Sequence, residues 1–183
     1  MSDTPTIAVA SCSLNTASRS HRLAEAAAAA VRAVGAKADL IDLREWDLPI
    51  CDGKASFEHP SVSQLREKLE TASAILVSAP VYNYDLNAAA KNLVEMTGAA
   101  WKEKPVGFLC AAGGDRSYMS PIGFANSLML DFRCLIIPRF VYCTGADFDS
   151  DGTLAAPLHE RVDQLARLAI ELAAALERVR QSA

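Results

Sequence analysis

The sequence predicts an α/β domain whose parallel sheet is covered by helices on both faces. Strand-like and helix-like segments alternate along the 183 residues, and such alternation is typical of parallel strands joined by crossover helices. Three strand-like segments, 7–11, 75–79 and 106–111, are almost wholly apolar, which favours strands that are buried on both sides. A chain of this length can bury a core without disulfides or metals, so we expect one domain over residues 1–183.

The first half of the chain supplies two strands and a long connection. The apolar strand 7–11 leads through the polar loop 12–20 into a helix, which ends at Gly35. Residues 37–43 alternate polar and apolar side chains, a pattern that predicts a strand near a sheet edge. The connection 44–60 is unusually long, and we expect it to cover a site or a subunit contact.

The middle of the chain repeats the helix and strand pattern. A helix is expected over 61–72, followed by the strand 75–79, whose apolar run ends at Pro80. Residues 81–85 are too polar and aromatic for a core strand, so we expect a loop. A helix over 88–96 follows.

The last third contains two more strands, each followed by a helix. The strand 106–111 leads through a glycine-containing loop to a helix that starts near Ser120 and Pro121. A strand over 135–144 is interrupted by Pro138 and is therefore expected at a sheet edge, and an amphipathic helix over 157–182 ends the chain. The buried stripe of the first of these helices is expected to comprise Ile122, Ala125, Leu128, Met129 and Phe132.

These elements predict a flavodoxin-like three-layer α/β/α sandwich with a five-stranded parallel sheet in the order 2-1-3-4-5. The three apolar strands occupy the middle of that sheet, and the two less regular strands lie at its edges. The loops after strands 1, 3 and 4 then meet at the carboxyl edge of the sheet, which is where folds of this type bind ligands.

Composition and charge exclude several classes of function. A net charge of −4 argues against a nucleic-acid partner, and no apolar run reaches the length of a membrane span. The N-terminus lacks a signal-peptide pattern. The five cysteines form no C-x-x-C pair and are expected to be reduced thiols in a cytoplasmic protein. The three histidines are scattered, so we expect no metal site.

The first loop has the composition of an anion site. It carries Ser13, Asn15, Ser18 and Ser20 just before a helix, where free N–H groups and the helix dipole favour negative charge. The loop matches neither G-x-x-x-x-G-K-[ST] nor G-x-G-x-x-G, so neither a nucleoside triphosphate nor an ordinary dinucleotide is expected. The simpler alternative is that one serine merely caps the helix, although the loop holds more hydroxyl groups than capping requires.

The two later loops suit a flat ring. Tyr82 and Tyr84 offer aromatic surfaces and Asn83 offers hydrogen bonds, although an ordinary turn with exposed tyrosines is the alternative. Gly113 and Gly114 permit the backbone to approach a ligand closely. An anion pocket beside an aromatic ledge and a glycine-lined slot describes a site for flavin mononucleotide (FMN).

Three segments resemble the NAD(P)H-dependent FMN reductase family. Residues 12–24, CSLNTASRSHRLA, resemble its phosphate loop, G-S-L-R-x-x-S-x-N-x-x-L-A. Residues 80–83, PVYN, followed by KN at 91–92, resemble its P-x-Y-N…K-N segment, and residues 111–114, AAGG, resemble its third flavin loop. The chain departs from the family pattern at Cys12 for glycine, Asn15 for arginine, Ser20 for asparagine, Val81 for glutamate and Tyr84 for a common glycine.

The resemblance implies a single flavodoxin-like FMN-binding domain over residues 1–183. It assigns the phosphate to Ser13, Asn15, Ser18 and Ser20, one side of the ring to Pro80, Val81, Tyr82 and Asn83, and the other side to Gly113, Gly114, Asp115 and Ser117. No catalytic side chain is implied, because the flavin carries the redox chemistry.

The resulting hypothesis is an FMN-dependent NAD(P)H oxidoreductase that passes electrons to a flavin, a quinone or a similar small acceptor. The alternatives are a non-enzymatic electron carrier of the flavodoxin class and a regulatory domain of the same fold that has lost its flavin. A homodimer or homotetramer is expected from the long 44–60 connection, from Trp101, which we expect to be exposed, and from the resemblance.

Overall fold

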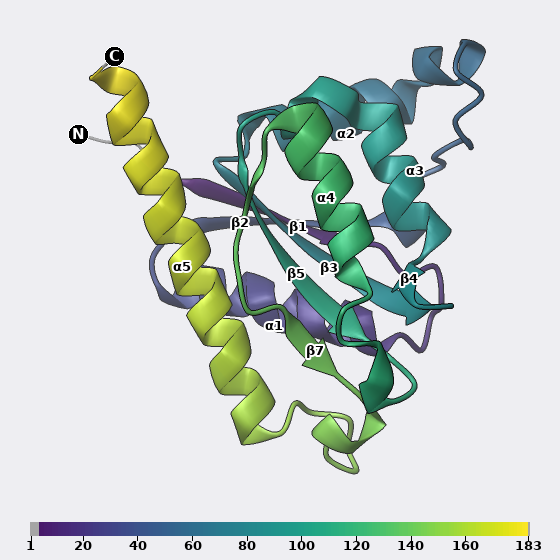
Figure 1. Cartoon of the computed structure of the whole chain (residues 1–183), viewed down its shortest axis with the longest axis vertical. Helices are drawn as coiled ribbons and strands as arrows, with labels where there is room; N and C mark the ends of the chain where they lie inside the picture. Colours follow the sequence, from purple (N-terminus) through teal and green to yellow (C-terminus); the bar gives the residue numbers. More distant parts are fainter. Residues whose placement is uncertain (1–3, 183) are drawn as a thin grey trace.

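The structure is a computed structural model that describes residues 4–182. Within these residues a seven-stranded sheet has a parallel backbone of five strands in the spatial order β2-β1-β3-β5-β6 (Figure 1). These are β2 (Lys37–Asp42), β1 (Thr6–Ser11), β3 (Ala74–Tyr82), β5 (Pro105–Ala111) and β6 (Leu135–Ile136). Counting parallel strands along the chain, this is the expected 2-1-3-4-5 order, so the fold prediction is confirmed.

Helices cover both faces of the sheet, as Figure 1 shows. Two helices share one apolar cluster with one face, and three others share the second cluster with the opposite face. The first group is α1 (Arg19–Ala33) and α5 (Ala156–Gln181), and the second is α2 (Pro60–Thr71), α3 (Ala88–Thr97) and α4 (Pro121–Phe132). The three-layer arrangement therefore agrees with the sequence prediction.

The expected loop 81–85 is instead a β-hairpin. Strand β3 runs on through Pro80 to Tyr82, because the fixed φ of proline suits an extended backbone, and the chain turns back into β4 (Asp85–Leu86). Asn83 and Tyr84 form the turn with φ values of 52° and 62°. Two consecutive positive φ angles are typical of the two-residue type I′ hairpin.

The last strand is also different from its prediction. Residues 135–144 form two short strands, β6 and β7 (Val141–Cys143), which pair with different parts of β5. Pro138 and Arg139, the latter with φ of 62°, lie in the break between them. The expected edge position is confirmed, because both short strands flank β5 on the same side.

Two expectations about burial were wrong. Ile122 and Met129 are 43% and 44% exposed, because α4 turns Phe124, Ala125 and Leu128 toward the sheet. Trp101 is fully buried, and its indole N–H donates to Thr97 Oγ1 at 2.7 Å. The helix that ends beside it and the 3₁₀ turn Gly98–Trp101 fold the indole inward.

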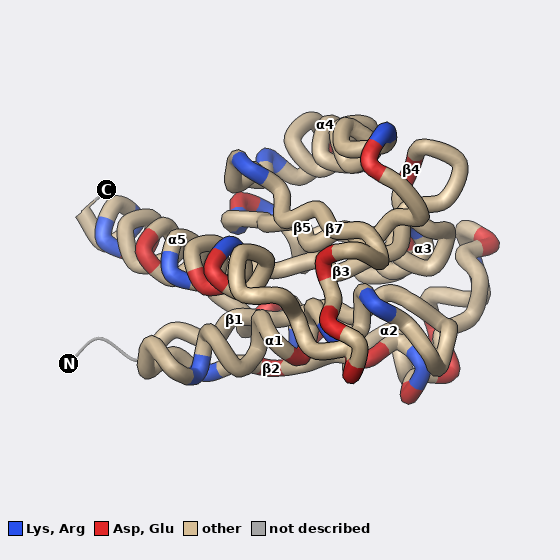
Figure 2. Tube along the Cα trace, turned by 90° about the horizontal axis from the view of Figure 1, so that it is seen from below, with Lys and Arg blue, Asp and Glu red and all other residues tan. Residues whose placement is uncertain are grey.

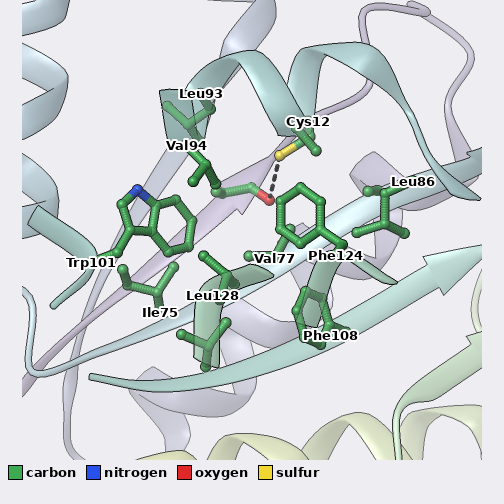
Figure 3. Close-up of a cluster of buried hydrophobic side chains, with 14 of the residues drawn as sticks. Cys12, Ile75, Val77, Leu86, Leu93, Val94, Trp101, Phe108, Phe124 and Leu128 are labelled. Carbon is green, nitrogen blue, oxygen red and sulfur yellow. Dashed lines mark hydrogen bonds between the residues drawn. The ribbon is translucent and has the colours of Figure 1, made fainter. Parts of the chain in front are cut away.

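Aromatic packing holds α4 against the sheet. The rings of Phe108 on β5 and Phe124 on α4 meet edge to face, with centroids 5.9 Å apart, and Phe140 meets Phe108 in the same way at 5.5 Å. Figure 3 shows Trp101, Phe108 and Phe124 within one apolar cluster. None of the helices in residues 4–182 combines the length and apolarity needed to cross a membrane.

We expect Trp101→Ala to lower the free energy of unfolding by about 3–5 kcal/mol, because it removes a fully buried indole and leaves a cavity. Denaturant unfolding measures the loss. Val179→Ala, at a side chain that is 63% exposed, is the matched control and should change stability by less than about 0.5 kcal/mol. Equal effects of the two substitutions would contradict the burial of Trp101.

Candidate functional site

A hollow of about 340 Å³ lies at the carboxyl edge of the sheet, where the first loop meets the ends of β3 and β5. Its lining brings together eight of the twelve residues expected from the sequence, namely Ser13, Asn15, Ser18, Ser20, Pro80, Val81, Tyr82 and Gly113. The lining excludes the other four, Asn83, Gly114, Asp115 and Ser117, which lie in the adjoining turns.

Larger hollows lie elsewhere. One of about 730 Å³ is lined by Thr6 and Lys37 at the amino ends of β1 and β2, and another of about 590 Å³ lies between α5 and the β6–β7 connection. Parallel sheets of this type bind ligands at their carboxyl edge. Position and chemistry therefore favour the smaller hollow over the larger ones.

The first loop is shaped by its own side chains. Ser13 Oγ accepts a hydrogen bond from the Asn15 N–H at 3.2 Å, and Asn15 Oδ1 accepts one from the Ala17 N–H at 3.0 Å. These are the local turns that serine and asparagine favour. Since Ser13 Oγ acts there as an acceptor, its hydroxyl proton remains free to donate.

Ser18 caps α1, so the expectation that one serine of this loop caps the helix is confirmed. Its Oγ accepts from the His21 N–H at 3.2 Å and shares a hydrogen bond with Ser20 Oγ at 2.8 Å. That shared bond uses one of the two hydroxyl protons. In addition, the N–H groups of Arg19 and Ser20 find no acceptor among residues 4–182. The loop thus offers several donors to an anion beyond what capping consumes.

Buried hydrogen bonds fix this loop to the sheet. Ser78 Oγ on β3 donates to the Ser20 carbonyl at 2.6 Å, and the Cys12 N–H donates to the Ser78 carbonyl at 2.8 Å. Asn87 makes no capping bond to α3; its Nδ2 donates to the Cys12 carbonyl at 2.7 Å. Asn87 Oδ1 is buried and has no partner among the described residues, which leaves one acceptor available beside the loop.

Cys12 does not obstruct the site, although it stands where the family has glycine. Its side chain is fully buried in the apolar cluster that also holds Leu86 and Phe124 (Figure 3), and it is not among the residues that line the hollow. Burial raises the pKa of this thiol to about 12. The residue is therefore a small core side chain and an unreactive thiol at neutral pH.

Arg44 backs the loop but is already neutralised. It forms an ion pair with Asp42 at the end of β2, and its Nη1 also donates to the Thr16 carbonyl at 3.5 Å. Burial opposes ionisation of Asp42, yet the hydrogen bonds and charge of Arg44 outweigh it and hold the pKa of Asp42 below its usual value.

Arg19 is a site residue that sequence reasoning missed. It lines the hollow between Ser18 and Ser20, its guanidinium lies against Gly145 beside a second hollow that Asp149 and Asp151 also line, and none of the ion pairs among residues 4–182 includes it. A cation in the first turn of a helix opposes the helix dipole, and this turn contains no acidic residue that would offset it. A bound anion would remove that conflict, so the arrangement favours a phosphate here.

The third loop leaves room for a flat ligand. A Cβ atom placed on Gly113 or Gly114 would meet no heavy atom of the described residues within 4 Å. Ser117 Oγ shares a hydrogen bond with the Tyr142 hydroxyl at 2.7 Å, and that hydroxyl donates to the Gly114 carbonyl. Tyr142 therefore holds the glycine segment in place, and Ser117 positions the Tyr142 hydroxyl. Together with the donors of the first loop, the open slot fits FMN, the group that the resemblance implies.

Comparison with known proteins identifies a family and its members. A sequence profile of the NADPH-dependent FMN reductase family matches residues 5–146. A probable NADPH:quinone oxidoreductase 1 of Oryza sativa subsp. japonica is 29% identical over 148 residues, which are 72% of this chain and 72% of that protein. An FMN reductase (NADPH) of Pseudomonas aeruginosa is 29% identical over 140 residues, or 75% and 73% of the two chains.

Solved structures share the fold. An NADH:FMN oxidoreductase in its apo form has a TM-score of 0.74 at 17% identity, covering 91% of this chain and 90% of that one. A flavoenzyme NAD(P)H:(acceptor) oxidoreductase from Paracoccus denitrificans has a TM-score of 0.72 at 21% identity, covering 92% and 98%. A flavodoxin, WrbA-like protein from Agrobacterium tumefaciens has a TM-score of 0.64 at 14% identity, covering 93% and 98%.

We expect inorganic phosphate to raise the Tm of the protein, and Arg19→Ala to reduce that rise, because the substitution removes a positive charge from the first turn of α1 beside the hollow. Thermal unfolding in phosphate and in a second buffer of equal ionic strength measures the effect. Arg167→Ala, at an exposed position of α5, is the control and should keep the full rise. A phosphate effect that is undiminished in Arg19→Ala would contradict the contribution of this charge.

Proposed function

Because the chain belongs to the NADPH-dependent FMN reductase family, we propose that its three converging loops hold one FMN, which NAD(P)H reduces in place. The observation that carries this proposal is the single hollow in which unused donors of the first loop lie across from the glycine slot of the third. No metal takes part in the proposed reaction.

The proposed contacts divide between the phosphate and the ring. Hydroxyl groups of Ser13, Ser18 and Ser20 and the free N–H groups of Arg19 and Ser20 at the start of α1 would hold the phosphate. Pro80, Val81 and Tyr82 would lie along one side of the ring, and Gly113 with Gly114 along the other. Asn15, Asn83, Asp115 and Ser117 would act by shaping the loops that carry these contacts.

The protein's part in the reaction is to bind and orient. When bound, FMN accepts a hydride from NAD(P)H and returns two electrons to an acceptor. The residues proposed to hold the ring lie at the sheet edge and on the flanking loops and would leave one face of it open, so donor and acceptor would use that face in turn. No side chain of the hollow needs to move a proton, and its hydroxyl and amide groups serve to position the cofactor.

The proposed acceptor is a flavin, a quinone or a similar small molecule. Support comes from the similar proteins of Oryza sativa and Pseudomonas aeruginosa, whose descriptions name a quinone oxidoreductase and an FMN reductase. The alternative without flavin is disfavoured by the burial of Cys12 away from the hollow and by the unused donors of the first loop. The electron-carrier alternative predicts different kinetics, because a carrier would not oxidise NAD(P)H.

We further propose that two or more copies of the chain associate through α4. Met129 and Leu130 on its outer surface are 44% and 76% exposed, and Ile122 is 43% exposed. Figure 2 shows that α4 is almost free of charged residues along its length, whereas α5 carries charges of both signs. A helix with one charged residue, Asp131, and several exposed apolar side chains is typical of a helix that is covered by a partner. This surface replaces Trp101 as support for a homodimer or homotetramer.

The remaining proposals concern the whole chain. Residues 1–183 are proposed to form one FMN-binding domain. A cytoplasmic location is proposed because the five cysteines are all unpaired thiols in the structure, which suits a reducing compartment.

We expect the purified protein to bind about one FMN per chain and to turn over by a ping-pong mechanism. Hydride transfer requires the nicotinamide within about 3–3.5 Å of the flavin, so the acceptor cannot enter until the donor has left. Steady-state rates at several NAD(P)H and quinone concentrations should give parallel double-reciprocal lines. A carrier would show no NAD(P)H oxidation, and that result would reject the enzymatic function.

We expect Met129→Glu combined with Leu130→Glu to convert the oligomer to a monomer, because burying two carboxylates at an apolar contact is costly. Light scattering at micromolar concentration measures the mass. Val179→Glu, an exposed apolar position on α5, is the control and should leave the mass unchanged. A wild-type monomer under these conditions would overturn the proposed assembly.

A further inference from the structure

The turn of the β3–β4 hairpin contains a residue type that this kind of turn disfavours. Tyr82 pairs with Asp85 and Val81 with Leu86, so Asn83 and Tyr84 are the two turn residues, both with positive φ. In such type I′ turns asparagine is favoured first and glycine second. Asn83 obeys this preference, whereas Tyr84 places a bulky side chain where a glycine is favoured.

Nothing within the described chain compensates for this conformation. A bulky residue at φ of 62° is strained, because its Cβ crowds the backbone. The Tyr84 side chain is 69% exposed, and its hydroxyl makes no hydrogen bond to residues 4–182. Backbone strain that no contact of the side chain offsets is a reason to seek a role in binding.

The strained residue is close in the chain to a residue that lines the hollow. Tyr82, which lines the hollow, is two residues away and 54% exposed, so the two Cα atoms are within about 7 Å. The hairpin therefore carries two exposed aromatic side chains next to the hollow, whose hydroxyl groups belong to the first loop.

We propose that Tyr84 is a specificity-determining residue whose ring, together with that of Tyr82, stacks against planar aromatic electron acceptors such as quinones. The proposal rests on the proposed function and names the acceptor class of that same site. In the overall reaction NAD(P)H gives up a hydride, and the quinone takes up those two electrons and two protons, one of them from solvent, to become a hydroquinone. Tyr84 transfers neither electrons nor protons; it positions the acceptor.

The test is Tyr84→Gly, assayed with two acceptors of different shape. Menadione is a planar two-ring quinone, whereas hexacyanoferrate(III) is a compact anion that presents no flat ring. We expect kcat/KM for menadione to fall about three- to tenfold, as expected for the loss of one aromatic contact, with less than a twofold change for hexacyanoferrate(III). FMN affinity should be unchanged, and Tm should rise by about 2–4 °C because the strain is relieved.

Two further variants separate the ring from the strain. Arg139→Gly relieves the same φ of 62° on the far edge of the sheet, so it should raise Tm without altering acceptor preference. Tyr84→Phe keeps the ring in the strained turn, so it should retain the wild-type preference for menadione.

The outcomes distinguish the two proposals. Three results for Tyr84→Gly would overturn the role of Tyr84 while leaving the proposed function intact. These are an equal fall in kcat/KM for both acceptors, an unchanged kcat/KM for menadione, and a change in oligomeric mass. A wild-type protein that binds FMN but reduces neither acceptor with NAD(P)H would overturn both. The proposal would be supported if Tyr84→Gly lost the preference for menadione and Tyr84→Phe retained it.

Discussion

The site depends on one buried hydrogen bond, from Ser78 Oγ on β3 to the carbonyl of Ser20 at the start of α1. The N–H of Cys12 returns to the carbonyl of the same serine, so the ends of β1 and β3 and the N-terminus of α1 are joined at a single residue. Because these groups are shielded from water, breaking either bond would leave a buried polar atom unpaired. The first loop is consequently held rigidly against the sheet, and its donors are arranged before a ligand arrives.

Two local conflicts lie beside this anchored loop. Arg19 sets a cation against the positive end of a helix dipole, and Tyr84 occupies a turn position that favours glycine. The charge of Arg44, which also lies behind the first loop, is neutralised by a direct ion pair with Asp42. Arg19, by contrast, has no ion-pair partner among the described residues, and its guanidinium lies against Gly145. Natural sequences break local rules chiefly at functional sites, so both conflicts fit a binding role for this end of the sheet.

The helices on the two faces of the sheet present different outer surfaces to solvent. On one face α1 and α5 pack against each other and against the strands, and α5 shows alternating charges to solvent. On the other face α4 is anchored through Phe124 and Phe108 but carries apolar side chains on its outer surface as well. The asymmetry places a surface suited to association on the side that also carries the β3–β4 hairpin.

The sequence by itself determined the order of elements, the layers and the three loops that meet at the carboxyl edge. Apolar runs such as 75–79 identify strands buried on both sides, and the alternation of elements then leaves few topologies. Eight of the twelve residues expected at the site line one hollow for that reason.

Only the tertiary structure decided what depends on neighbours distant in the chain. Local pattern could not show the burial of Trp101, the exposure of Ile122, the hairpin at Asn83 and Tyr84, or the unpaired charge of Arg19. Periodicity records which residues share a face, but not which element covers that face, and the preferred Asn-Gly signal for the hairpin is missing. Whether a charge is free depends on every side chain around it, and that is a property of the folded chain alone.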